Sequence, residues 1–365
     1  MIEDKKKTVA VGLSGGVDSA VSAYILKEQG YKVIGIYMSN WKETRENGEC
    51  TGEQDWEDVR SICQTLDIPY YSFDLSEEYY ESVFKHFVSE YKKGRTPNPD
   101  VLCNKEIKFG KFAEKIKEMD IPYLATGHYA KAVHDSGRHY LYRSKDENKD
   151  QTYFLNQVTE EQLSNVIFPL ADIEKQTVRA IANKLNLKVA NKKDSTGICF
   201  IGERNFRNFL AQYIPMQKGK IVSINGETVG EHNGVFFYTL GQRKGLGIGG
   251  KKDGNGDKWF VVGKDVQNNV LIVSQSESEL LYKDTLECNE FHYINKEIYE
   301  GNVLVRYKHR QELQEANLRL ENHKAIIEFK DKQRAIAEGQ YAVIYDGKKC
   351  LGGGVIDIAY NREKA

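Results

Sequence analysis

A short glycine turn near the N-terminus limits the folds open to this chain more than any other feature. The string Ser14-Gly15-Gly16-Val17-Asp18-Ser19 follows an apolar run at 8–13 and opens a helix-like stretch at 20–27. A strand, a glycine turn and a helix start form a phosphate-binding geometry, because backbone N–H groups and the positive helix end converge on an anion. The string matches neither G-x-x-x-x-G-K-[ST] nor G-x-G-x-x-G, which excludes the two commonest nucleotide loops. A plain glycine turn joining a strand to a helix is the simpler alternative.

The polar side chains of this turn also suit a nucleotide. Ser14 and Ser19 can add hydroxyl donors to the backbone N–H groups. Asp18 offers a carboxylate of the kind that holds the Mg²⁺ accompanying a nucleotide. We therefore expect a phosphate site here, with no metal held by the protein alone.

Composition narrows the class of protein. A chain of 365 residues is too long for one typical core, so two or three domains are expected. It is 40% hydrophobic and 29% charged, with no run near the roughly 18 apolar residues of a membrane span and no secretory signal pattern. We expect a cytoplasmic protein without membrane contact, and a monomer. The net charge of −1 does not indicate a nucleic-acid partner, although a local basic stripe would be enough to bind one.

The first third of the chain alternates strand and helix patterns. Apolar runs occur at 9–13, 31–38, 69–73 and 121–126, and helix-like segments at 20–29, 55–66, 77–91 and 105–119. This alternation predicts an α/β fold with a parallel sheet covered by helices on both faces. Ligands of such sheets sit beyond the carboxyl ends of the strands. The segments 12–19, 38–41, 95–104 and 127–128 should therefore share one crevice.

The rest of the chain changes character twice. Residues 145–215 are expected to be largely helical, with segments near 160–166, 174–185 and 203–213. From Gly219 glycine becomes dense, β-branched and aromatic residues alternate, and turn signals recur at Asn225-Gly226 and Asp346-Gly347. This part should form two small β units, at about 215–280 and 281–362.

Two loops each carry one cysteine ahead of an expected helix. In Gly94 to Asn104 two prolines exclude a helix through the segment, which places Cys103 just before a helix starting near Lys105. The second loop, Asp194 to Gly202, holds Cys199 in the same way. A positive helix end favours a thiolate, so the paired arrangement indicates reactive thiols rather than buried filler. The six cysteines never approach C-x-x-C spacing, which argues against a zinc ribbon.

These motifs together resemble the tRNA-specific 2-thiouridylase family, whose members replace O2 of the wobble uridine with sulfur. The 14–19 loop alone resembles the wider ATP pyrophosphatase (PP-loop) superfamily. Pro97 to Asn104 and Ser195 to Gly202 are specific to the thiouridylase family. The resemblance extends over nearly the whole chain, through 38–41, 125–129, 149–155, 238–246 and 259–263.

The resemblance implies a domain plan. A catalytic domain of the PP-loop type (adenine nucleotide α-hydrolase-like), with a helical extension, would occupy 1–214. A small β-rich central domain would occupy 215–280, and a C-terminal β-barrel-like domain that binds tRNA would occupy 281–365.

The resemblance also implies roles for particular residues. ATP would be a co-substrate together with Mg²⁺, and no tightly bound prosthetic group is expected. The residues that would bind ATP are Gly12, Leu13, Ser14, Gly15, Gly16, Val17, Asp18, Ser19, Met38 and Gly127. The target base would meet Asn98, Pro99 and Asp100. Cys103 would be the nucleophile and Cys199 the persulfide carrier, joined in a transient disulfide, with Asp100 as general acid or base. The tRNA would contact His128, Asp150, Gln151, Thr152, Arg306, Tyr307 and Gln340.

The reaction that the resemblance implies is ATP-dependent sulfur transfer. Adenylation of O2 of uridine 34 makes AMP the leaving group, and a persulfide on Cys199 then brings sulfur to C2. Cys103 either attacks the persulfide to free hydrosulfide or assists while the persulfide attacks directly. The implied partners are tRNA, expected to be the Lys, Glu and Gln tRNAs, and an outside persulfide donor such as a cysteine desulfurase or relay protein.

Simpler interpretations stand beside several of these roles. Asp100 is equally suited to capping the next helix, Asp150 to the N-cap of a helix start, and His128 to a loop hydrogen bond. Basic elements such as 306–310 suit phosphate contacts or an ordinary solvated surface. The family usually has Arg where Lys308 stands, so a bidentate contact there is in doubt.

The sequence is also compatible with two other classes of protein. One is another ATP pyrophosphatase, such as an amidotransferase-type synthetase or a tRNA lysidine synthetase, which needs no paired cysteines. The other is an RNA-binding module without enzymatic activity, which would leave residues 8–200 unexplained.

Overall fold

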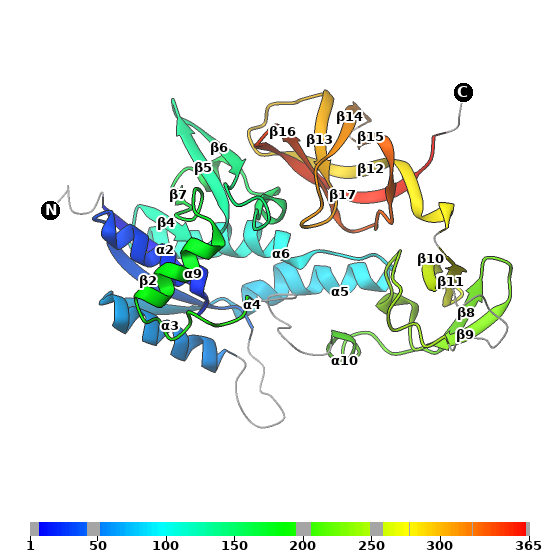
Figure 1. Cartoon of the computed structure of the whole chain (residues 1–365), viewed down its shortest axis with the longest axis horizontal. Helices are drawn as coiled ribbons and strands as arrows, with labels where there is room; N and C mark the ends of the chain where they lie inside the picture. Colours follow the sequence, from blue (N-terminus) through cyan, green and yellow to red (C-terminus); the bar gives the residue numbers. More distant parts are fainter. Residues whose placement is uncertain are drawn as a thin grey trace.

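The computed structural model describes residues 7–41, 52–194, 206–248, 258–276, 278–322 and 324–362. Three units lie side by side (Figure 1). An N-terminal α/β unit is at the left, a C-terminal β-barrel at the upper right, and a small four-stranded sheet at the lower right. Helix α5 (Lys85–Lys92) extends from the first unit between the other two.

The N-terminal unit is built on a parallel sheet of order β3-β2-β1-β4-β7. The strands are β1 (Thr8–Leu13), β2 (Lys32–Ser39), β3 (Tyr70–Asp74), β4 (Tyr123–Thr126) and β7 (Val166–Ile167). Alternate residues of β1 enter two separate cores: Val9 and Val11 belong to one, and Ala10 to the other. A central strand buried on both faces is typical of a parallel sheet between two helical layers, as the sequence predicts.

The helices divide between these two faces. One core includes apolar residues of α2 (Val17–Glu28), α3 (Glu53–Leu66) and α9 (Lys175–Lys184). The other includes residues of two longer helical runs. The first run joins α4 (Ser76–Tyr79), η1 (Tyr80–Phe84) and α5, and the second joins α6 (Pro99–Leu102), η2 (Cys103–Lys111) and α7 (Phe112–Glu118).

The start of the second run corrects a prediction from the sequence. The prolines were expected to keep residues up to Asn104 out of a helix, but α6 begins at Pro99. Asn98 is its N-cap, and the Asn98 side chain accepts a hydrogen bond from the Asp100 N–H at 3.2 Å. Proline is well tolerated at the first helical position, because its missing N–H would have no partner there. Cys103 therefore lies inside the helical run rather than ahead of it.

A β-hairpin within the N-terminal part was not predicted. Strands β5 (Ala130–Asp135) and β6 (Arg138–Arg143) pair with each other, and β6 pairs with β17 of the barrel. The region 145–215 is less helical than expected, since it contains only η3 (Thr152–Leu155), α8 (Glu160–Leu163), α9 and α10 (Phe206–Leu210) among its described helices. The hairpin, which follows β4 of the first unit in the chain, thus extends the sheet of the barrel and connects the two units.

The C-terminal strands form the expected two β units. The central sheet has the order β10 (Trp259–Asp265), β11 (Val270–Gln275), β8 (Gly219–Ser223) and β9 (Thr228–His232), with η4 (Val235–Phe237) following β9. The barrel follows η5 (Glu279–Leu281) and has the order β12 (Tyr282–Tyr293), β15 (Lys324–Arg334), β14 (Gln314–Glu321), β13 (Gly301–Arg306), β16 (Tyr341–Asp346) and β17 (Lys349–Tyr360). Pairing of β12 with β17 closes it. Both predicted turns, at Asn225-Gly226 and Asp346-Gly347, join hairpin strands.

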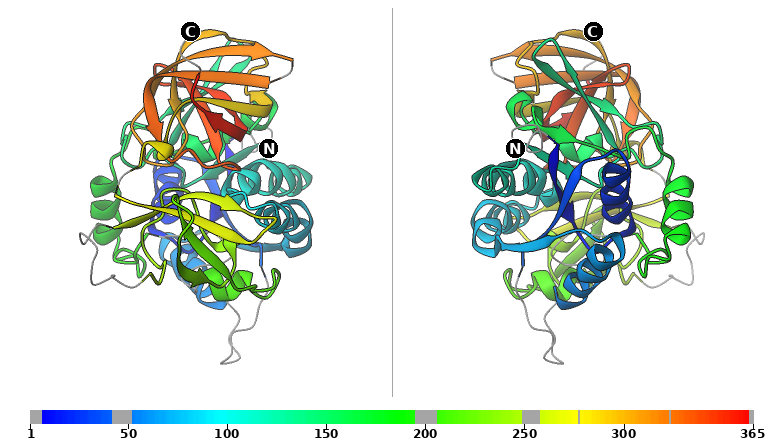
Figure 2. Two further views of the ribbon diagram at one scale, coloured as in Figure 1. Left: turned by 90° about the vertical axis from the view of Figure 1, so that its right-hand side faces the viewer. Right: turned by 90° about the vertical axis from the view of Figure 1, so that its left-hand side faces the viewer.

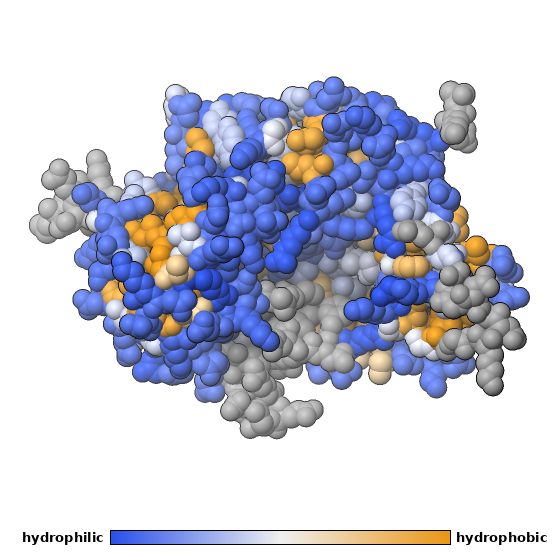
Figure 3. Space-filling model, in the orientation of Figure 1, coloured by the Kyte–Doolittle hydropathy of each residue, from blue (hydrophilic) through white to orange (hydrophobic). Residues whose placement is uncertain are grey.

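The surface is mixed in character. Figure 3 shows one face that is mainly hydrophilic, with apolar residues in separate patches. Figure 2 shows the barrel stacked on the N-terminal unit from two further sides. No helix among the described residues has both the length and the apolar character needed to cross a membrane.

Candidate functional site

The phosphate loop (Ser14–Ser19) lies at the carboxyl end of β1, where the sequence predicts it. The Ser14 and Ser19 hydroxyls are 3.4 Å apart, and the Ser19 hydroxyl donates to the Gly16 carbonyl at 3.1 Å. Gly16 is the N-cap of α2 and makes no side-chain hydrogen bond there. The first turn of α2 therefore offers its backbone N–H groups at this end of the sheet, as anion binding requires.

Two neighbouring strands bring further predicted residues to the same edge. Met38 lies near the end of β2, whose register places Tyr37 beside Leu13. Gly127 follows β4, whose Thr126 pairs with Gly12. A Cβ on Gly127 would lie 2.7 Å from the Ser19 nitrogen, so only glycine allows this approach to the phosphate loop. The predicted ATP residues are thus gathered at one sheet edge.

Asp18 is held by two residues that sequence analysis missed. Lys175 Nζ, at the first position of α9, lies 2.7 and 2.8 Å from the two Asp18 carboxylate oxygens. The Tyr129 hydroxyl donates to the same carboxylate at 3.0 Å. Burial and then the neighbouring Asp18 charge raise the pKa of Tyr129, so its proton stays in place. A carboxylate is a ligand that Mg²⁺ accepts, so Asp18 is the residue of this loop that would hold such an ion, and Mg²⁺ binding itself stays a prediction.

Lys175 also links the phosphate loop to Asp194. The Asp194 carboxylate receives Lys175 Nζ at 2.8 Å, Lys149 Nζ at 2.8 Å and Arg179 Nη2 at 2.7 Å. Burial opposes ionisation of Asp194, but hydrogen bonds from Lys149 and Lys175 outweigh it and lower the pKa of this carboxyl. The site therefore contains a network of fixed charges in contact with Asp18.

A second lysine supports the outer side of the loop. Lys192 Nζ donates to the Gly15 carbonyl at 3.1 Å, and it lies 2.8 Å from Asp55 and 2.7 Å from Asp58 on α3. Burial alone would lower the pKa of Lys192, but its bonds to the two carboxylates raise it. The ammonium group therefore stays charged and joins the loop to α3.

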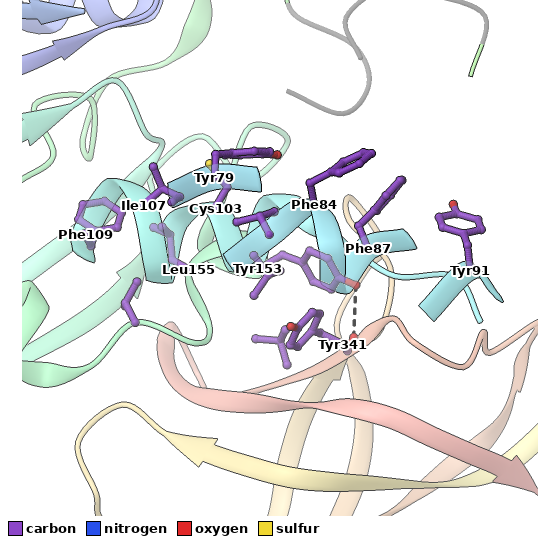
Figure 4. Close-up of a cluster of buried hydrophobic side chains, with 14 of the residues drawn as sticks. Tyr79, Phe84, Phe87, Tyr91, Cys103, Ile107, Phe109, Tyr153, Leu155 and Tyr341 are labelled. Carbon is purple, nitrogen blue, oxygen red and sulfur yellow. Dashed lines mark hydrogen bonds between the residues drawn. The ribbon is translucent and has the colours of Figure 1, made fainter. Parts of the chain in front are cut away.

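The predicted target-base residues and Cys103 lie at the start of the α6–η2 run. Asn98 caps the run, Pro99 is its first residue, and the Asp100 N–H is the group that the cap satisfies. Cys103 is buried in an apolar cluster that also contains Tyr79, as Figure 4 shows. The residue is 1% exposed, so the described conformation does not present its thiol to a large substrate. Cys199 lies outside the described residues, and its pairing with Cys103 stays a prediction.

Three residues predicted to contact tRNA lie in the interior instead of on the surface. Asp150 accepts from Arg306 Nη1 at 2.9 Å and from the Thr152 hydroxyl at 2.9 Å. The Arg306 and Asp150 side chains are 3% and 0% exposed. Asp150 also accepts from the Thr152 N–H at 3.4 Å, but the N-cap of η3 is Gln151, so the simpler interpretation of Asp150 as the N-cap is wrong by one residue. Contact of these three residues with RNA stays a prediction, and in this structure they join the first unit to the barrel.

Three more of the predicted tRNA residues lie around the same junction: Gln151, Tyr307 and Gln340. Tyr307 is buried, and its hydroxyl donates to the Gln333 side chain and the Arg334 carbonyl at 3.3 Å each. The Gln340 side chain bonds to Tyr153 and to Thr96. The Gln151 side chain accepts from the Tyr129 N–H at 3.0 Å. Their contacts with tRNA also stay predictions.

His128 is half-buried beside Phe109 and Phe168. Its Nδ1 lies 2.7 Å from the Thr126 hydroxyl, which is the loop hydrogen bond of the simpler interpretation. Burial and then the charge of Lys108 lower its pKa well below the usual value, so the ring is neutral at pH 7. Any contact with RNA would therefore be a hydrogen bond or stacking contact of a neutral ring.

Three other cysteines are buried and poorly suited to reaction. Burial raises the pKa of Cys63 to about 12 and raises the pKa values of Cys288 and Cys350 as well. A thiol that stays protonated is a poor nucleophile. Cys50 lies outside the described residues.

The fold and the site together define a nucleotide-binding α/β protein with two appended β units. The sequence matches three family models: the tRNA methyl transferase HUP domain over residues 7–203, the tRNA methyl transferase PRC-barrel domain over 207–275, and the aminomethyltransferase beta-barrel domain over 283–356. Proteins named tRNA-specific 2-thiouridylase MnmA match along 96% or more of the chain. The chain belongs to the tRNA-specific 2-thiouridylase family.

Three relatives illustrate that match. The Streptococcus thermophilus (strain ATCC BAA-491 / LMD-9) protein is 48% identical over 368 residues, covering 100% of this chain and 99% of the relative. The Bacillus subtilis (strain 168) protein is 50% identical, covering 96% and 95%. The Staphylococcus epidermidis RP62A protein is 50% identical, covering 99% and 98%.

Proposed function

We propose that this protein is a tRNA 2-thiouridylase, which uses ATP to replace O2 of uridine 34 with sulfur and yields 2-thiouridine, AMP and pyrophosphate. One observation carries the proposal. A phosphate loop and a cysteine-bearing helix opened by Asn98 and Pro99 occur in one chain that is about half identical, from end to end, to 2-thiouridylases.

The phosphate loop supplies the activation step. The C2 carbonyl of uracil is a poor electrophile, because oxide is a poor leaving group. Attack of O2 on the α-phosphate of ATP releases pyrophosphate and converts the oxygen into part of AMP, which leaves readily. Backbone N–H groups of α2 would hold the phosphates, and Lys175 would neutralise charge beside Asp18.

The cysteines supply the sulfur step. A persulfide on Cys199, loaded by an outside donor, would provide the terminal sulfur. In one route the Cys103 thiolate attacks the inner sulfur of this persulfide, which forms a Cys103–Cys199 disulfide and expels hydrosulfide to attack C2. In the other route the terminal persulfide sulfur attacks C2 directly and expels AMP, and the Cys103 thiolate then cleaves the remaining S–S bond, which releases 2-thiouridine and leaves the same disulfide. In both routes a thiol reductant must reduce this disulfide before the next turnover. Because Cys103 is buried, either route requires the start of the α6–η2 run to be uncovered in the complex.

The proposal also covers the RNA partner, the sulfur donor, the cellular compartment and the role of Asp100. The RNA partner would be tRNA with uridine at the wobble position, expected to be the Lys, Glu and Gln tRNAs. The sulfur would come from a cysteine desulfurase or relay protein, in the cytoplasm where tRNA is modified. Asp100, whose N–H is capped by Asn98, would act as general acid or base near the base.

The test is reconstitution with purified protein, unmodified tRNA, Mg-ATP, a persulfide donor and a thiol reductant that regenerates the two cysteines. Mass spectrometry of the digested tRNA should detect 2-thiouridine at position 34, with AMP and pyrophosphate formed in equal amounts. Cys103→Ser and Cys199→Ser should each abolish sulfur incorporation, whereas Cys50→Ser should not. Wild-type protein that turns over ATP with tRNA but makes no 2-thiouridine would point to another ATP pyrophosphatase. Absence of any ATP turnover would favour an RNA-binding module.

A further inference from the structure

The loop that leads into the Cys103 helix is held by both β units. This loop, Gly94–Asn98, connects α5 to the N-cap of α6 and belongs to the first unit. Its neighbours come from β10 of the central sheet and from the turn before β16 in the barrel. Three parts of the chain that are distant in sequence thus meet at five residues.

The central sheet holds the first residue of the loop. Lys264 Nζ on β10 donates to the Gly94 carbonyl and, at 3.1 Å, to the Tyr238 carbonyl. Burial lowers the pKa of Lys264 to about 8, so its ammonium group is mostly protonated at pH 7. Gly94 has a φ of 77°, and a Cβ there would lie 2.3 Å from the Val266 side chain. The contact is therefore close enough to exclude any residue but glycine.

The barrel holds the middle of the loop through the peptide groups of Thr96. The Thr96 N–H donates to the Glu338 carbonyl at 2.8 Å, and the Thr96 carbonyl accepts from Gln340 Nε2 at 2.7 Å. The other end of the same amide, Gln340 Oε1, accepts from the Tyr153 hydroxyl at 3.2 Å. Gln340 is thus engaged at both ends within the protein.

Arg95 adds charged contacts that tie the loop to the barrel and to α5. Its guanidinium donates to the Ile356 carbonyl at 2.7 Å and pairs with Asp357 at 3.1 Å, both on β17. It also lies 3.1 Å from Glu90 on α5. The loop is therefore tied to the barrel at two successive residues.

We propose that Gln340 and Lys264 are positioning residues: by holding this loop, they fix the positions of Asn98 and of the start of the Cys103 helix. This proposal rests on the function proposed above. Because α6 begins at Pro99, directly after the loop, a displacement of the loop moves the helix start with it. Misplacement of reacting groups by about 1 Å can cost a hundredfold in rate. The two β units would in this way control the chemistry from a distance, and Gln340 would act through Thr96 rather than by touching tRNA.

The first test separates positioning from RNA contact. Gln340→Leu and Lys264→Met should each lower kcat for 2-thiouridine formation about tenfold or more, while the Kd for tRNA stays within about twofold. Gln340→Glu keeps an acceptor for Tyr153 but loses the donor to Thr96, so it should behave like Gln340→Leu. Lys258→Met, at an exposed position just before β10, is the matched control and should behave like the wild type. A Gln340→Leu variant with weaker tRNA binding and unchanged kcat would overturn the proposal in favour of direct contact.

The second test asks whether both residues act through one loop. Residues that act independently have multiplicative effects on rate, whereas residues that act through a shared element do not. The double variant should therefore lose little more activity than the worse single variant, and a fully multiplicative loss would contradict the proposal.

A third measurement needs no activity. Hydrogen exchange of the peptide covering 95–103 should accelerate in both single variants and not in Lys258→Met, because the loop amides lose their restraint. Unchanged exchange in that peptide would refute the positioning role even if the wild type made no 2-thiouridine. Lack of 2-thiouridine with the expected change in exchange would instead count only against the proposed function.

Discussion

Arg306 of the barrel and Asp150 of the N-terminal unit form a buried ion pair, with Arg306 Nη1 2.9 Å from Asp150 Oδ2. Thr152 donates to the same carboxylate and lies 3.1 Å from the Tyr345 hydroxyl of β16. A buried carboxylate is stable only when its hydrogen bonds are satisfied. Arg306 is therefore part of the joint between the two units, whatever contact it makes with RNA.

Removing one partner of this pair should loosen the joint. Arg306→Met leaves the Asp150 carboxylate without its main cationic partner, at a cost of about 3–5 kcal/mol. We expect a lower thermal midpoint and earlier proteolysis between the units than in the wild type. Asp150→Asn combined with Arg306→Met should restore part of the loss, because the unpaired carboxylate is removed; the recovery is incomplete because Arg143, 3.5 Å from Asp150 Oδ2, then loses its buried partner. A thermal midpoint for Arg306→Met equal to that of the wild type would contradict this account.

Lys175 should matter for the nucleotide more than for folding. Its ammonium lies within 2.8 Å of both Asp18 and Asp194. We expect Lys175→Met to lower kcat/KM for ATP at least about tenfold, because a cation beside the phosphates is lost. The measurement is pyrophosphate release at varied ATP. Lys184→Met, at the exposed far end of the same helix, should leave kcat/KM near the wild-type value.

Much of this arrangement could be predicted from the sequence, and the exceptions share a cause. The sheet and phosphate loop are encoded locally, since buried strands and helix periods recur within short windows. The β5–β6 hairpin was missed because its barrel partner, β17, lies far along the chain. Lys175 and Lys192 stand in polar segments without a motif, and Lys264 directly follows the 259–263 segment, which does not indicate what the lysine binds. Only the folded chain shows the acceptors of these three residues. The helix start at Pro99 had a local signal, Asn98-Pro99-Asp100, which fits an N-cap followed by proline and an acidic first turn.

Gly127→Ala tests the close approach of β4 to the phosphate loop. The new Cβ would lie 2.7 Å from the Ser19 nitrogen and 2.9 Å from the Asp18 carbonyl carbon, both backbone atoms that cannot swing away. We expect the loop to shift and the KM for ATP to rise about tenfold. Gly230→Ala is a suitable control, because its Cβ would meet only side-chain atoms at 3.6 Å or more. Equal KM values in the two variants would argue against Gly127 as part of the site.

Lys264 should give stability a distinctive pH dependence. Burial lowers the pKa of this lysine from 10.5 to about 8 in the folded protein. Between these two values the unfolded chain binds a proton that the folded chain does not, so this residue makes stability rise with pH across that window. Lys308, whose pKa is also lowered to about 8 by burial and then by Arg334, contributes in the same direction.

Chemical denaturation from pH 7.5 to 10.5 should therefore show that the free energy of unfolding rises less steeply with pH, or falls more steeply, in Lys264→Met than in the wild type. The slope in Lys258→Met should match the wild type, because that side chain is exposed. Identical slopes in Lys264→Met and the wild type would mean that Lys264 keeps an ordinary pKa and that its ammonium is not confined between the Gly94 and Tyr238 carbonyls.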